Sequence, residues 1–109
     1  MSDENRQHEI REAYKAYAKA KADRVYLEHF RKSKKALLMK QFEPDYPTAA
    51  AQEREAYAHP EYIELLKGLQ AATQIEEETR YRLKMYELSF EEWRTRQANK
   101  RADRQRYNA

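Results

Sequence analysis

Cysteine is absent from this chain and glycine nearly so: its 109 residues include no Cys, one Gly and three Pro. The absence of cysteine excludes disulfides, a thiolate nucleophile and any Cys-containing zinc site. A single glycine excludes a phosphate-cradling loop and a dinucleotide-binding fingerprint. The β-branched residues are few: Val25, Ile10, Ile63, Ile75 and four threonines. Because sheets depend on β-branched and turn-forming residues, the composition predicts an all-α protein.

Long apolar runs are missing as well. The longest one inside a candidate helix covers residues 36–39, whereas a helix needs ~20 apolar residues to span a bilayer. Residues 2–5 read Ser-Asp-Glu-Asn, where a signal peptide would carry basic and then apolar residues. We therefore expect no membrane association and a cytoplasmic location.

Residue types for catalysis and metal binding are sparse. The serines are Ser2, Ser33 and Ser89, and the histidines are His8, His29 and His59. No serine stands in a predicted turn that would expose it as a nucleophile, and no histidine has a second one at helical ligand spacing. The glutamates 76–78 point in different directions on a helix, so we interpret them as a solvated acidic turn around one core residue. We expect no enzyme, no cofactor, no metal and no small-molecule substrate.

A heptad pattern runs without interruption over residues 60–97. One core position holds Tyr62, Leu69, Glu76, Leu83, Phe90 and Gln97, and the other holds Leu65, Ala72, Thr79, Tyr86 and Trp93. Eight of these eleven residues are apolar. The pattern predicts one amphipathic helix about 57 Å long.

A first long helix is predicted from an N-cap at Ser2 to Phe42, because nothing between them breaks a helix. Its apolar residues form two stripes: Ile10, Ala13, Tyr14, Tyr17 and Ala20, then Leu27, Phe30, Leu37, Leu38 and Gln41. The second stripe is rotated from the first by about a third to half a turn. This helix is therefore expected either to supercoil strongly around its partner or to contact two partners along its length.

Prolines separate the predicted helices. Pro44 and Pro47 end the first helix, Thr48 caps a short one over 49–58, and Pro60 begins the long one. We expect a long antiparallel helical hairpin with coiled-coil-like packing as a single domain over 1–98. Residues 99–109 are expected to form a basic C-terminal tail that is frayed or disordered until it binds. Gly68 within the long helix is expected to mark a close packing contact.

Charge is distributed in blocks along the chain. Residues 21–42 carry seven basic and two acidic groups, residues 43–79 two basic and nine acidic, and residues 80–109 nine basic and four acidic. In an antiparallel hairpin, residues whose numbers sum to about 102 become neighbours, which places 21–42 beside 60–79. We therefore expect the basic run 31–35 to be neutralised within the hairpin, and the core residue Glu76 to pair with Arg24.

The basic C-terminal end lacks such compensation and is the candidate nucleic-acid-binding surface. Its candidate phosphate contacts are Arg80, Arg82, Arg94, Arg96, Lys100, Arg101, Arg104 and Arg106. Aromatic residues among arginines can stack on bases, and they are equally common at protein interfaces. Tyr14, Tyr17, Tyr86, Phe90 and Trp93 fall on the stripes and are predicted interface residues. Because two helices bury only one side of each apolar residue, we expect a homodimer or a larger protein partner.

Three short motifs follow one another along residues 30–100. They are Arg31-Lys32-x-x-Lys35-Ala36, then Thr48-x-Ala50 with Glu53-Arg54-Glu55-Ala56 and Ala58, then Glu92-Trp93-Arg94-Thr95-x-x-Ala98-Asn99. In these motifs the chain resembles small phage- and prophage-encoded helical proteins of DNA replication and recombination regions. The resemblance implies an accessory role in the host cytoplasm and transfers no catalytic residue.

Two functions from different classes remain open. The first is a phage-type accessory protein that binds DNA or RNA through its basic C-terminal end. The second is a protein-interaction adaptor or inhibitor that docks on a host protein machine without contacting nucleic acid.

Overall fold

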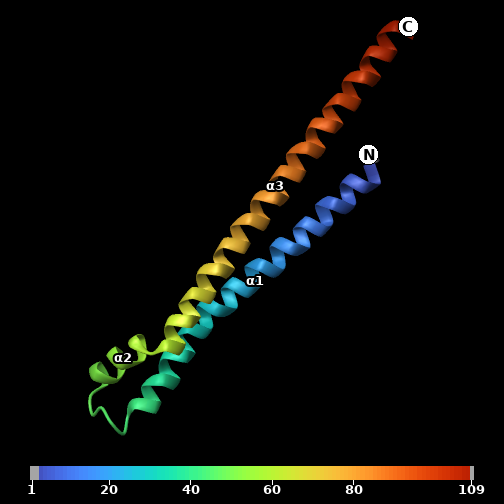
Figure 1. The fold of residues 1–109 in the computed structure, drawn as a ribbon. Helices are drawn as coiled ribbons and strands as arrows, with labels where there is room; N and C mark the ends of the chain where they lie inside the picture. Colours follow the sequence, from blue (N-terminus) through green and yellow to red (C-terminus); the bar gives the residue numbers. More distant parts are fainter. Residues whose placement is uncertain (1–2, 109) are drawn as a thin grey trace. The chain divides into compact units, whose positions relative to one another are not determined.

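The described residues of this computed structural model, 3–108, form three α-helices and no strand. The helices are α1 (Asp3–Phe42), α2 (Ala49–Ala58) and α3 (Pro60–Asn108) (Figure 1). The expected all-α hairpin, with two long helices joined through a short one, is confirmed. The predicted N-cap at Ser2 lies outside the described residues.

Local signals set the helix boundaries in the connection. The Thr48 hydroxyl accepts a hydrogen bond from the Ala51 backbone N–H at 3.1 Å, which caps α2 as predicted. Pro60 is the first residue of α3, as expected from its fixed φ and missing N–H. The imidazole Nδ1 of His59 accepts a hydrogen bond from the backbone N–H of Glu61 at 3.0 Å, so this ring caps α3.

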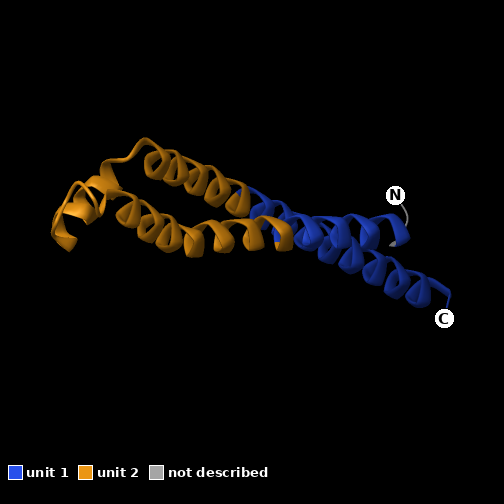
Figure 2. Cartoon of the chain, turned by 90° about the horizontal axis from the view of Figure 1, so that it is seen from below, with its two compact units in different colours: residues 1–17, 78–109 blue, residues 18–77 orange. Residues whose placement is uncertain are grey.

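The chain divides into two compact units that each contain parts of both long helices (Figure 2). Unit 1 comprises Met1–Tyr17 and Glu78–Ala109, and unit 2 comprises Ala18–Glu77. In unit 1, the beginning of α1 lies antiparallel to the second part of α3. Unit 2 is a hairpin of α1 and α3 with α2 between them in the chain.

The core of unit 2 lies where α2 meets the long helices. Leu38, Ala56 and Tyr62 are buried there, with Met39 packed against them. The ring of Tyr57 meets that of Tyr62 edge to face, with 5.2 Å between centroids. Each of the three helices therefore contributes to this core.

The predicted heptad positions of α3 are its inner positions. All of them except Tyr86 are buried or half-buried, and Tyr86 is 37% exposed. Leu83 is buried in unit 1, and Tyr62 and Glu76 are buried in unit 2.

The two predicted stripes of α1 need a correction. Its inner side is one continuous heptad line: Arg6, Ile10, Ala13, Tyr17, Ala20, Arg24, Leu27, Arg31, Lys34 and Leu38, each buried or half-buried. Arg24, Arg31 and Lys34 occupy this line after Ala20, because long cationic stems can pack along a helix interface. The heads of Arg24 and Lys34 pair with Glu76 and Glu61. Leu37, from the second predicted stripe, is 59% exposed instead.

Two further expectations about α3 differ from the structure. A Cβ at Gly68 would meet no atom within 4 Å, so the expected close contact is absent. The helix continues to Asn108, where we expected a frayed end after residue 98. Residues 98–108 are exposed, so this end of the helix is held mainly by its own backbone hydrogen bonds. The boundary between a domain and a basic tail remains a prediction.

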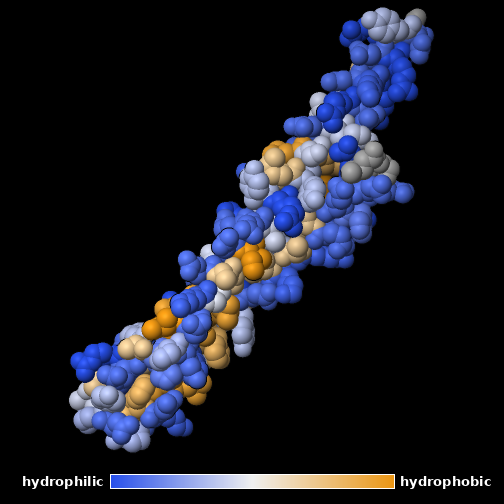
Figure 3. Space-filling view, in the orientation of Figure 1, coloured by the Kyte–Doolittle hydropathy of each residue, from blue (hydrophilic) through white to orange (hydrophobic). Residues whose placement is uncertain are grey.

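None of the helices among the described residues has an apolar stretch that could cross a bilayer. On the face drawn in Figure 3, apolar side chains reach the surface of both units between charged ones. The cytoplasmic location remains a prediction.

Candidate nucleic-acid interface

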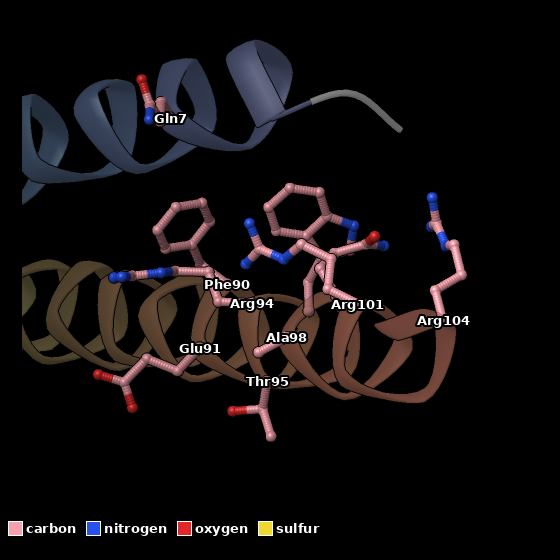
Figure 4. A pocket seen from close by; sticks show the side chains of 10 residues that line it. Gln7, Phe90, Glu91, Arg94, Thr95, Ala98, Arg101 and Arg104 are labelled. Carbon is pink, nitrogen blue, oxygen red and sulfur yellow. The ribbon is translucent and has the colours of Figure 1, made fainter. Parts of the chain in front are cut away.

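One face of α3 in unit 1 gathers arginine and aromatic side chains. Its members follow the helical spacing i, i+4, i+7, i+11 and i+14: Phe90, Arg94, Gln97, Arg101 and Arg104. Together with Trp93 and with Gln7 from α1, they line an open hollow of about 990 Å³ (Figure 4). We call this hollow the arginine–aromatic site.

The aromatic part of the site is covered by guanidinium groups. The rings of Phe90 and Trp93 lie 6.0 Å apart and are inclined by 23°. The guanidinium carbon of Arg94 lies 5.8 Å from the Phe90 ring, and that of Arg6 lies 5.1 Å from the Trp93 ring. Both contacts lie within the range of cation–π attraction.

Arg6, which contacts the Trp93 ring of the site, is a residue that the sequence interpretation missed. Its Nε is buried and donates no hydrogen bond to any described residue. The contact of this side chain that the structure shows is the one with the Trp93 ring. The sequence does indicate an inner position for Arg6, because it stands one heptad before Ala13 on the inner line of α1.

Several cations of unit 2 are paired with acids. In unit 2, Lys34 Nζ lies 2.7 Å from Glu61 Oε2, and Lys35 Nζ lies 3.2 Å from Glu53 Oε1. These pairs confirm that the acidic block neutralises part of the basic run of α1. The hydrogen bond from Lys34 lowers the pKa of Glu61.

Two further basic groups of unit 2 have raised pKa values. Hydrogen bonds to Glu76, and then to Glu28, raise the pKa of Arg24. A hydrogen bond with the Tyr57 hydroxyl, and then one with Glu53, raises the pKa of Lys35. In both cases the partner favours the charged form of the cation.

Three arginines of the basic end of α3 have no comparable pairing. No ion pair joins Arg94, Arg101 or Arg104 to a carboxylate among the residues that the structure describes. In Figure 4, Arg101 and Arg104 project from α3 on the same side as Phe90, while Glu91 and Thr95 project away from it. The site therefore presents positive charge beside aromatic rings.

The structure brings some of the predicted residues together and leaves others apart. Arg94, Arg101, Arg104, Phe90 and Trp93 share the arginine–aromatic site. The remaining candidate cations, all exposed and outside that hollow, are Arg80, Arg82, Arg96, Lys100 and Arg106. Of the other predicted interface residues, Tyr14 is 61% exposed, Tyr17 is half-buried, and Tyr86 lies on the inner side of α3.

Within the described residues, no group of three His, Cys, Asp or Glu side chains is arranged to hold a metal ion. Comparisons of the chain with protein-family models, with curated proteins and with solved structures gave no match.

Proposed function

We propose that this chain is a phage-type accessory protein that binds nucleic acid through the arginine–aromatic site. The observation that carries the proposal is the set of unpaired arginines, Arg94, Arg101 and Arg104, on one helical face beside Phe90 and Trp93. Guanidinium groups bind phosphate oxygens in bidentate geometry, and aromatic rings stack on bases.

The contrast between the two units supports the choice of this surface. A cation that already pairs with a carboxylate must give up that pair before it can bind a phosphate. Lys34 and Lys35 are paired in this way, whereas the arginines of the site are not. Two of the four cations in the basic run 31–35 are therefore engaged, whereas none of the three arginines of the site is, which favours the site over that run as the phosphate-binding surface.

A salt titration tests the proposal. The probe is a fluorescein-labelled single-stranded oligonucleotide, as DNA and as RNA, with binding measured by anisotropy between about 50 and 200 mM salt. We expect Arg94→Gln, Arg101→Gln and Arg104→Gln together to weaken binding and to reduce the slope of log affinity against log salt by about two. Trp93 is the single tryptophan, so its fluorescence should change when the wild type binds.

A matched variant removes three cations that the structure shows in ion pairs: Lys19→Gln, Lys34→Gln and Lys67→Gln. This variant loses the same formal charge. It should nevertheless retain most of the wild-type affinity for the oligonucleotide and most of the slope of log affinity against log salt. Equal losses in both triple variants would show that binding follows net charge alone, and would contradict the proposed site. Circular dichroism of each variant checks that the helices remain.

The second candidate function is a protein-interaction adaptor or inhibitor that docks on a host protein machine. The observation that favours it is a set of large apolar residues left exposed on α3, with Tyr81 at 66%, Met85 at 44% and Leu88 at 45%. Absence of wild-type binding to either oligonucleotide at low salt would favour this candidate, because even nonspecific electrostatic binding is strongest there.

A further inference from the structure

A second hollow, of about 700 Å³, lies in unit 2 between α1 and the Tyr57–Tyr62 pair. Its lining combines the apolar residues Ala36 and Met39 with the cations Arg31, Lys32 and Lys35. Lys35 already contacts Glu53 and the ring of Tyr57. Arg31 and Lys32 form no ion pair with any described carboxylate. This cationic hollow therefore suits a ligand that has both an apolar body and negative charge.

The chain itself carries a surface of that chemistry on α3 in unit 1. Tyr81, Met85 and Leu88 follow the spacing i, i+4 and i+7, and each is exposed. Glu91 and Glu92 come three and four residues after Leu88, so on a helix their carboxylates lie beside its side chain. Neither glutamate forms an ion pair with a described cation. We call these five residues the acidic strip.

Most of the acidic strip faces away from the arginine–aromatic site, and of its five residues Glu91 alone also lines that hollow. At 100° per residue, Leu88 and Glu92 point about 160° away from Phe90 around the axis of α3. Figure 4 shows Glu91 directed away from the side on which Phe90 and Arg101 lie. A partner seated on Leu88 and Glu92 would therefore leave the face of Phe90, Arg101 and Arg104 open.

We propose that the chain self-associates by placing the acidic strip of one copy in the cationic hollow of another. Leu88 and Met85 would cover the apolar lining, and the two glutamates would face Arg31 and Lys32. The strip and the hollow are complementary in two respects. Apolar surface meets apolar surface, and two unpaired carboxylates meet two unpaired cations. A second copy is the occupant because this chain supplies both halves in exposed form.

Limited burial within one copy agrees with this proposal. The buried apolar residues in the described part of the chain are Ala13, Ala20, Leu38, Ala56, Tyr62 and Leu83. Three of these six are alanines, which contribute little apolar area. Three large apolar side chains exposed in a row on α3 are typical of an interface, not of a free surface.

Sedimentation equilibrium of the full chain, without nucleic acid, tests the proposal. For the wild type at about 1 to 100 µM, we expect an average mass above 13.2 kDa that rises with concentration. Lys32→Glu changes the hollow and Glu92→Lys changes the strip, and both residues are exposed, so neither change should unfold the chain. Each variant alone should associate about tenfold more weakly.

Mixing the two variants supplies the decisive result. Lys32→Glu retains an acidic strip and Glu92→Lys retains a cationic hollow, while the altered hollow of the first fits the altered strip of the second. An equimolar mixture should therefore associate more strongly than either variant alone, as an intermolecular contact requires.

A matched control is Asp103→Lys, which makes the same charge change at an exposed residue of α3 eleven positions beyond the strip and should leave association unchanged. A wild type that stays at 13.2 kDa, a mixture without recovery, or equal weakening by Asp103→Lys would each overturn the proposal. None of these outcomes bears on oligonucleotide binding, so the proposed function is tested separately.

Discussion

Glu76 and Arg24 form the contact that links α1 to α3 most specifically in unit 2. Arg24 Nε donates to Glu76 Oε2 at 2.6 Å, and Nη2 donates to Oε1 at 3.2 Å. Glu76 is 8% exposed, although it stands at a core position of the heptad. A buried carboxylate is costly unless it is paired, and a bidentate pair also restricts the register of the two helices.

We expect Arg24→Met to lower the melting temperature by about 5 to 10 °C, because Glu76 would stay buried without its guanidinium partner. Adding Glu76→Leu should restore most of the loss, since an apolar pair of similar volume replaces the ion pair. Thermal unfolding followed by circular dichroism measures both. Glu28→Gln, which removes the exposed acid beside Arg24, serves as the control and should have little effect. A double variant no more stable than Arg24→Met would contradict this account.

At the scale of the element, α3 carries a glycine that its packing does not require. Gly68 is exposed, and a methyl group there would meet no atom within 4 Å. Glycine in a helix interior costs conformational entropy that alanine does not. Gly68→Ala should therefore raise the free energy of unfolding by about 0.5 to 1 kcal/mol, as measured by urea denaturation.

The exposed Ala71, one turn along the same helix, offers the reverse change. Ala71→Gly should lower the free energy of unfolding by a similar amount. A loss of stability in Gly68→Ala would mean that this position faces a partner, such as another copy, that a methyl group displaces.

At the scale of the whole molecule, charge is segregated and the pairs of unit 2 depend on ionised acids. The pKa of Glu61 is lowered by Lys34, so the folded state holds this carboxylate in its charged form more strongly than the unfolded state does. The stabilisation is present above the ordinary glutamate pKa of about 4.5 and is lost as the pH falls through the lowered value.

We expect the wild type to melt at a higher temperature than Glu61→Gln at pH 7, and the difference to disappear as the solution is acidified below pH 4. The difference should be small, because the pair is exposed. Melting temperatures at several pH values, taken on both proteins by circular dichroism, supply the measurement. A difference that stays constant down to pH 2 would show that the effect of Glu61 is not electrostatic.

Much of the fold and part of the candidate site are predictable from the sequence. The proline positions, the Thr48 cap and the uninterrupted heptad of 60–97 predict the three helices, because these signals act within a few residues. The antiparallel register follows from the hairpin, and it pairs Arg24 with Glu76 as observed. Helical spacing alone also places Phe90, Arg94, Arg101 and Arg104 on one face.

The remaining features depend on contacts between residues far apart in the chain. The sequence by itself determined the helices, their ends and the segregation of charge, because those depend on local propensity and composition. Only the tertiary structure decided that Arg6 covers Trp93, that charged stems continue the inner line of α1, and that Gly68 faces open space. The physical reason is that long side chains such as arginine suit either a solvent-facing or an inner position, and the packing of the opposite helix selects between them.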